Sequence, residues 1–124
     1  MQPHDLRERT MRFALEAAMV CRSIQHDWQG RRLADQMFRS ATSVAANYHA
    51  ACRARSHREF IAKLGIVTEE AHETLFWLDF AARSRLLQPE SAEPLKREAR
   101  ELLAIFISSA KTAAANSPDR RYPS

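Results

Sequence analysis

Apolar side chains recur along this chain at alternating spacings of four and three residues. On a helix of about 3.6 residues per turn, this spacing keeps one apolar stripe on one face, as amphipathic helices do. Only two glycines occur in the 124 residues. A β-sandwich needs turn residues about every 8–12 positions, and two glycines cannot provide them. The sequence therefore predicts an all-α fold.

The first half of the chain predicts two helices. The first extends over about residues 5–27, and Gly30 is expected to break the chain after it. The second follows the apolar stripe from Leu33 to Ala51. Its face from Ser40 to Ala46 is lined by small side chains, so we expect two neighbouring helices to pack closely against it.

The second half predicts two more helices. Ser56 and Glu59 have the spacing of a capping box, which places the start of the third helix at about His57 and its end at about Arg83. Residues 88–91 end that pattern and open the last helix, which fades before Asn116.

Short links between four helices predict an antiparallel up-down-up-down bundle, because they leave no room for crossovers. The length allows one domain, which we place at residues 1–117 with a loose tail at 118–124. Gly65 lies inside the third predicted helix, and we expect another helix to pack closely against it.

The segments 75–82 and 102–107 carry more large apolar side chains than one bundle core can receive. Large exposed apolar patches on soluble proteins usually mark interfaces. We therefore expect a homo-oligomer that uses the outer faces of the third and fourth helices; the alternative is that these residues line a wide core. The candidate interface residues are Phe76, Trp77, Phe80, Leu103 and Ile107.

Two cysteines, no signal peptide and no run of about 20 apolar residues indicate a cytoplasmic protein with free thiols and no membrane partner. Glu69 and His72 form an E-x-x-H motif, and it is the only one in the sequence. A di-metal site in a four-helix bundle needs two such motifs, so we do not expect one here. His49 and Cys52 lack the further ligands that tetrahedral zinc needs. Glycine-rich phosphate loops and nucleophile motifs are also missing. We expect no catalytic residue, metal or cofactor, and hence no enzyme.

Charge is uneven along the chain, whose net charge is +4. Residues 1–63 hold 11 Lys and Arg against 6 Asp and Glu, whereas residues 64–124 hold 8 against 9. The link between the second and third helices lies alone at one end of an up-down bundle, with only Glu59 opposing its positive charge. The basic side chains there are Arg53, Arg55, Arg58 and Lys63.

These four side chains are our candidate contacts to the phosphates of RNA or DNA. Such surfaces bind by counterion release, with little sequence selectivity. The alternative is a solvated link whose arginines interact favourably with the C-terminus of the second helix. Asn47, on the apolar stripe of that helix, is expected to fix packing.

The segments Gln36–Asn47 and Arg55–Phe60 resemble the family of small four-helix bundles named for intervening sequences in bacterial 23S ribosomal RNA genes. The family pattern runs roughly Q-I-R-R-A-A-x-S-I-P-x-N-I-x-E-G and then R-x-S-x-x-E-F. Ala45 stands where the family usually has proline, and Ala50 and Ala51 replace its Glu-Gly pair, so the second helix is expected to be straighter. The matching residues are Gln36, Arg39, Ala41, Ser43, Asn47, Arg55, Ser56, Glu59 and Phe60.

The resemblance covers about residues 10–115 and implies an antiparallel bundle that forms rings, typically pentamers. It also implies kinship with the accessory protein of diversity-generating retroelements, a pentameric barrel that associates with a reverse transcriptase and nucleic acid. Most members of this family have no established biochemical activity.

The sequence thus predicts a self-assembling, non-enzymatic bundle that serves as a binding or scaffold module for RNA, DNA or a nucleic-acid enzyme. The alternative is a purely structural or protein-interaction oligomer without nucleic-acid binding. Apolar side chains at the basic end would favour that alternative.

Overall fold

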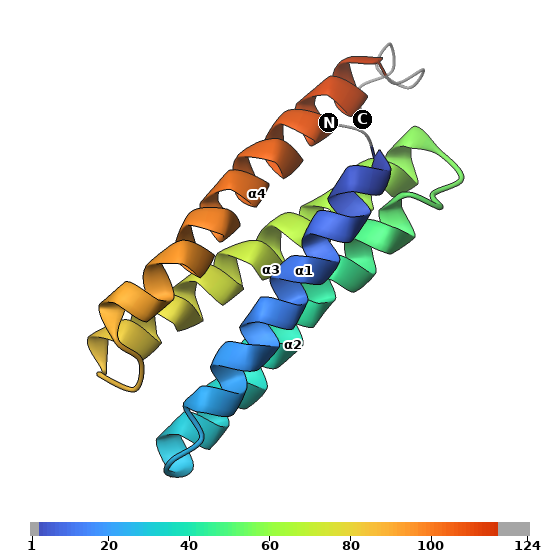
Figure 1. Ribbon diagram of the computed structural model, residues 1–124. Coiled ribbons are helices and arrows are strands. Elements are labelled where there is room, and N and C mark those ends of the chain that lie inside the picture. Colours follow the sequence, from blue (N-terminus) through green and yellow to red (C-terminus); the bar gives the residue numbers. More distant parts are fainter. Residues whose placement is uncertain (1–2, 117–124) are drawn as a thin grey trace.

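The computed structural model describes residues 3–116 and consists of four helices joined by short links. These are α1 (Pro3–Ser23), α2 (Trp28–Ala51), α3 (His57–Arg83) and α4 (Pro89–Asn116). The prediction of an all-α four-helix bundle is confirmed (Figure 1). The tail predicted at residues 118–124 lies outside the described residues.

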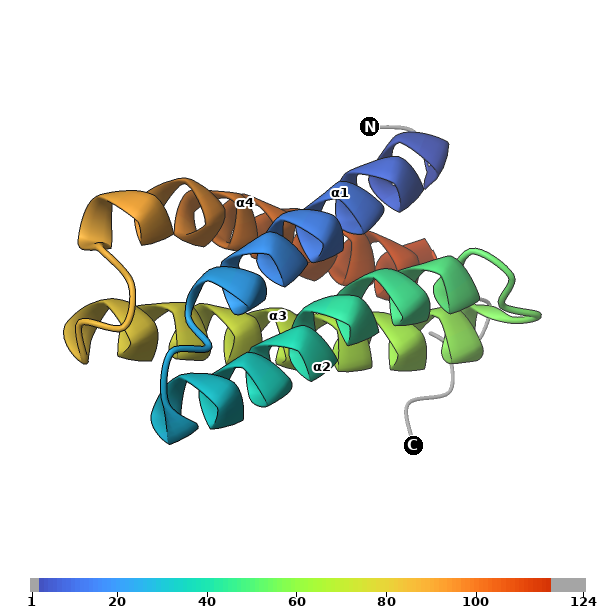
Figure 2. The same ribbon diagram turned by 60° about the horizontal axis from the view of Figure 1, so that its bottom comes forward.

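Consecutive helices run in opposite directions. Figures 1 and 2 show the α1–α2 and α3–α4 links at one end of the bundle and the α2–α3 link at the other. Contacts between α1 and α2 agree with this arrangement. His49 Nε2 lies 3.1 Å from the Arg7 carbonyl oxygen, whereas the Cys21 thiol donates to the Ala34 carbonyl at 3.4 Å. Residue numbers therefore rise along one helix as they fall along the other.

The core follows the predicted apolar stripes. Thr10 on α1 is fully buried together with these apolar side chains. As expected from its small side chains, α2 packs closely against two neighbours, α1 and α3. Helix α2 continues through Ala45 to Ala51 without interruption. The largest fully buried side chains include Phe13, Ile24, Met37, Leu64, Leu78, Leu102 and Phe106.

A buried polar contact joins α2 to α3. The hydroxyl oxygens of Ser40 and Thr74 lie 2.8 Å apart, and both residues are fully buried. Each hydroxyl also reaches a carbonyl oxygen of its own helix, on Met37 and Glu70 respectively. Buried polar groups need such partners, and this pair holds α2 and α3 in one register.

Helix α1 approaches α4 less closely than it approaches α2. Ionic contacts of Arg9 join α1 to α4 across the seam between them. Arg9 donates two hydrogen bonds to Glu98 and one to Glu101, each at 2.7 Å. These carboxylates raise the pKa of the Arg9 guanidinium.

The predicted break at Gly30 is wrong, because Gly30 lies inside the first turn of α2. The chain turns earlier, over residues 24–27, and the Asp27 carboxylate accepts a 2.8 Å hydrogen bond from the Gly30 amide. A Cβ atom at Gly30 would stand 1.7 Å from the Ile24 carbonyl oxygen. Glycine is therefore needed where the link folds back onto the helix.

The expected close packing at Gly65 is also wrong. No heavy atom of a neighbouring element lies within 4 Å of a Cβ built there, so this position on α3 faces open space. The Ser56 half of the capping box is as predicted, because Ser56 Oγ accepts from the Glu59 amide at 3.1 Å. The Glu59 carboxylate accepts from the Arg55 amide at 3.1 Å, one residue before the N-cap amide that a capping box uses.

No helix in residues 3–116 combines the length and apolar character required to cross a membrane.

Candidate functional site

The four predicted basic residues lie at one end of the bundle, which we call the basic end. Arg53 and Arg55 are exposed on the α2–α3 link, and Arg58 is exposed on the first turn of α3. Lys63 is half-buried on the second turn of α3. The start of α1 and the end of α4 lie at the same end (Figure 1).

Three of these side chains have no acidic partner within residues 3–116. Among the described residues, no carboxylate forms an ion pair with Arg53, Arg55 or Lys63. The Glu59 carboxylate accepts from the Arg55 amide. The expectation that Glu59 alone opposes the positive charge needs a correction, because Asp5 in the first turn of α1 also belongs to this end.

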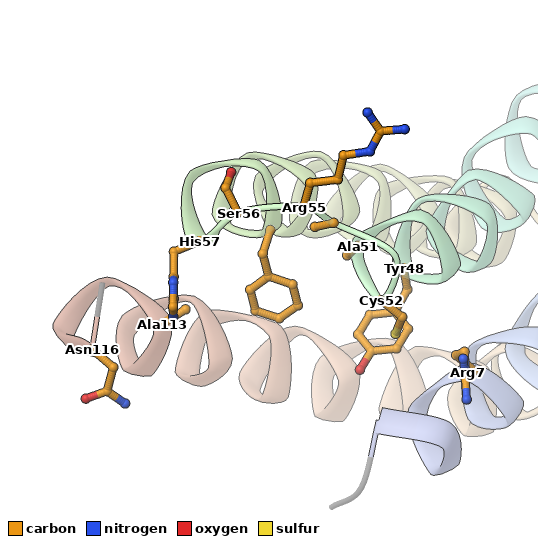
Figure 3. A pocket seen from close by; sticks show the side chains of 11 residues that line it. Arg7, Tyr48, Ala51, Cys52, Arg55, Ser56, His57, Ala113 and Asn116 are labelled. Carbon is orange, nitrogen blue, oxygen red and sulfur yellow. The ribbon is translucent and has the colours of Figure 1, made fainter. Parts of the chain in front are cut away.

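An open groove of about 580 Å³ lies beside these residues, between the end of α2, the start of α3 and the end of α4. Its position is shown in Figure 3. Eleven residues line it: Arg7, Tyr48, Ala51, Cys52, Ala54, Arg55, Ser56, His57, Phe60, Ala113 and Asn116.

Two aromatic rings contribute to the groove in different ways. Tyr48 is only 4% exposed, and its ring centroid lies 5.8 Å from that of Phe106, so it forms part of the floor. Burial raises the pKa of the Tyr48 hydroxyl, which keeps it protonated. Phe60 is half-buried and packs against the core from the side, so part of its ring is open to the groove.

The groove has a positively charged rim. Arg7 of α1 and Arg55 of the α2–α3 link supply this charge, His57 of α3 adds an imidazole, and no carboxylate of residues 3–116 lines the groove. In Figure 3 His57 points toward α4, whereas Arg55 extends away from α4 at the rim. An apolar floor under a basic rim suits a ligand that is both anionic and flat.

Arg55 was predicted from the sequence, whereas Arg7, Tyr48 and the groove itself were not. Arg7 lies forty-one positions before Tyr48, and only the packing of α1 beside α2 and α4 brings them together. Phe60 could have been predicted as a groove residue, because it directly follows Glu59 and belongs to the family pattern.

The described histidines and cysteines are not grouped into one site. Cys21 is buried against Ala34, and burial raises its pKa to about 11. Cys52 lines the groove, and His72 is exposed on α3. Within residues 3–116, no three His, Cys, Asp or Glu side chains are grouped so that they could hold a metal ion.

Several residues of the family pattern have structural contacts. Arg39 donates to Glu73 at 2.6 Å and lies 3.4 Å from Glu70, so it ties α2 to α3. The Asn47 amide donates to the carbonyl and hydroxyl oxygens of Ser43, at 2.9 and 2.8 Å. Asn47 is half-buried and bonded within α2, and it does not face the groove.

The structure exposes some of the five candidate interface residues and buries another. Phe76, Phe80 and Ile107 are 57%, 49% and 41% exposed, and Trp77 is half-buried beside the two phenylalanines. The prediction that Leu103 lies at the interface is wrong. Leu103 is 6% exposed and belongs to the core, so it has little surface to offer a second chain.

A second exposed apolar surface, on α1, was not predicted from the sequence. Met11, Leu15 and Met19 on α1 are each at least 41% exposed and spaced by four residues, which places them on one outer face. That spacing was readable in the sequence as a stripe parallel to the core stripe. Trp28 and Phe38 on α2 are exposed as well.

Comparison with known proteins identifies the fold and the family. A crystal structure of a protein with unknown function from the S23 ribosomal protein family of Bacteroides thetaiotaomicron matches with a TM-score of 0.83 and 28% sequence identity. The match covers 90% of this chain and 99% of that one. No curated protein matches the sequence. The family model for the 23S rRNA-intervening sequence protein matches residues 3–108. The chain therefore belongs to the 23S rRNA-intervening sequence protein family.

Proposed function

We propose that this chain is a non-enzymatic bundle that assembles into a ring and binds nucleic acid, or a nucleic-acid enzyme, through the basic end. The observation that carries the proposal is the set of side chains Arg53, Arg55 and Lys63, which no carboxylate of residues 3–116 neutralises. Phosphate backbones bind such surfaces because each contact releases condensed counterions.

Exposed apolar faces on diagonal helices support self-assembly. Phe76 and Phe80 lie on α3, while Met11, Leu15 and Met19 lie on α1. In a four-helix bundle these two helices do not neighbour each other, so their outer faces point to opposite sides. Two different faces that contact each other between copies form a heterologous interface, which closes into a ring when the rotation allows.

A ring would gather the basic ends on one face and multiply their charge. The family resemblance makes five the expected number of subunits. No residue of the described chain needs to be catalytic in this proposal, and the groove serves as a binding surface.

Light scattering tests the assembly. The wild-type mass should be several times 14.2 kDa at micromolar concentration, and five times in the proposed pentamer. The double variant Phe76→Ser/Phe80→Ser should give a smaller assembly with unchanged helical circular dichroism. Ala46→Ser, which changes an exposed residue of α2 and so lies on neither of the two helices that carry these faces, is the control. A wild-type mass of one chain would refute the ring.

Fluorescence anisotropy tests the binding, with a labelled single-stranded RNA and a labelled DNA duplex at low salt. Arg53→Gln/Arg55→Gln/Lys63→Gln should lose most of the affinity. A matched control removes three exposed positive charges elsewhere, in Arg31→Gln/Arg32→Gln/Arg97→Gln, and should retain it. Equal losses in both triple variants would mean that net charge alone attracts the nucleic acid.

The groove also supports a second candidate, a purely structural or protein-interaction oligomer. Apolar side chains do lie at the basic end, since Phe60, Ala51 and Ala113 line the groove. An assembled protein that binds neither RNA nor DNA at low salt would favour this second function.

A further inference from the structure

We propose that the groove at the basic end receives an unpaired base of a single-stranded nucleic acid, which stacks on Phe60 while arginines at the rim hold the adjacent phosphates. This inference rests on the proposed function and adds what part of the nucleic acid the site recognises. It assigns a ligand class to the groove, whereas the four basic residues alone would bind any phosphate backbone.

The aromatic component comes from Phe60. Its ring is half-buried, so one part is anchored in the core and another part lines the groove. Sites for single strands combine a basic groove with aromatic side chains on which bases stack, and stacking works for every base because each has a flat apolar face. Tyr48 lines the same groove, but at 4% exposure it is part of the floor and offers little ring surface for stacking.

The charge distribution around Phe60 matches a nucleotide. Arg7 and Arg55 reach the rim from α1 and the α2–α3 link, His57 lies beside them on α3, and among the described residues no carboxylate lines the groove. The groove at the opposite end, of about 590 Å³, is also aromatic but has Asp35 beside Arg32. A ligand with negative charge beside a flat apolar ring therefore fits the basic end better than the opposite end.

This site discriminates single strands from duplexes. A base inside a duplex is stacked on both faces and is not free to enter a concave groove. Phosphate contacts with Arg53 and Lys63 do not depend on the base. The base contact and the phosphate contact are therefore separable by experiment.

The test compares a short single-stranded DNA with an otherwise identical strand whose central nucleotides lack their bases. Binding is measured by anisotropy with the full chain as wild type, Phe60→Leu and Phe60→Tyr. The matched control is Phe38→Leu, which removes a 51% exposed phenylalanine from α2. Helical circular dichroism and light-scattering mass establish that each variant folds and assembles as the wild type does.

We expect the wild type to bind the complete strand roughly five- to a hundredfold more tightly than the abasic strand, the range that stacking on an aromatic ring supports. Phe60→Leu should bind both strands with the abasic affinity, while Phe60→Tyr and Phe38→Leu keep the wild-type preference. Equal wild-type affinities for the two strands, or a preference that survives Phe60→Leu, would overturn the base site and leave phosphate binding intact. Binding of neither strand would instead refute nucleic-acid binding by the basic end, the part of the proposed function on which this inference rests.

Discussion

The two glycines of the chain lie in opposite surroundings and should respond to alanine in opposite directions. At Gly30 an added Cβ would collide with the Ile24 carbonyl oxygen, so Gly30→Ala should cost roughly 1–3 kcal/mol as the link shifts. At Gly65 the added Cβ meets open space within an α-helix, so Gly65→Ala should raise the free energy of unfolding by about 0.5–1 kcal/mol.

Urea denaturation of both variants measures these changes. Light scattering serves as the control, because Gly65 lies on a surface that a second chain could cover. A loss of stability in Gly65→Ala at unchanged mass would show that this face of α3 is less open than described.

The buried hydroxyl groups of Ser40 and Thr74 should contribute cooperatively to the free energy of unfolding. Thr74→Val removes the hydroxyl that lies 2.8 Å from Ser40 Oγ and should lower the free energy of unfolding by roughly 1–2 kcal/mol. Adding Ser40→Ala should cost less than it does in the wild type, because its former partner is already gone. Strictly additive losses in the double-mutant cycle would contradict a coupled pair.

At the scale of helices, the contact between α2 and α3 should depend on pH. The hydrogen bond from Arg39 lowers the pKa of Glu73, and the Trp77 indole contributes from 3.3 Å. A carboxyl group with a lowered pKa stabilises the folded state above its unfolded pKa of about 4.3, and this contribution is lost as the pH falls through the folded pKa.

We therefore expect Arg39→Gln to be less stable than the wild type at neutral pH, with a difference that shrinks as the pH falls below about 4. Urea midpoints across this range are the measurement. Arg100→Gln, which removes an ion pair with Glu93 within α4, is the control and should give a much smaller pH-dependent difference. A difference in urea midpoint between Arg39→Gln and the wild type that stays constant down to pH 2 would show that the ionisation of Glu73 is not the cause.

Most of each helix could be predicted because its signals are local. The Ser56–Glu59 capping box fixes the start of α3, and the apolar stripes identify the buried faces. The link between α1 and α2 was misplaced because Gly30 was read as a helix breaker. Its actual role, which is to let a carbonyl of the link approach the helix, depends on three-dimensional packing.

At the scale of the whole molecule, the basic side chains were predictable but the groove was not. Arg53, Arg55 and Arg58 are close in sequence, so any up-down topology brings them to one end. The groove needs Arg7 from α1 and Ala113 from α4, and no local pattern connects these residues to Phe60. Leu103 was placed on the surface because its segment is apolar on both sides, and only the packing of α4 shows which side is buried.

Phosphate contacts at the basic end should make binding depend steeply on salt concentration, and a salt titration of the affinity measures this dependence. For a single strand, the logarithm of the affinity falls against the logarithm of salt concentration with a slope of about −0.7 for each phosphate neutralised. The triple variant Arg53→Gln/Arg55→Gln/Lys63→Gln should therefore have a slope shallower by about 2. The variant Arg31→Gln/Arg32→Gln/Arg97→Gln should keep the wild-type slope. Identical slopes for the wild type and both variants would contradict these contacts, because the phosphates would then be held elsewhere on the molecule.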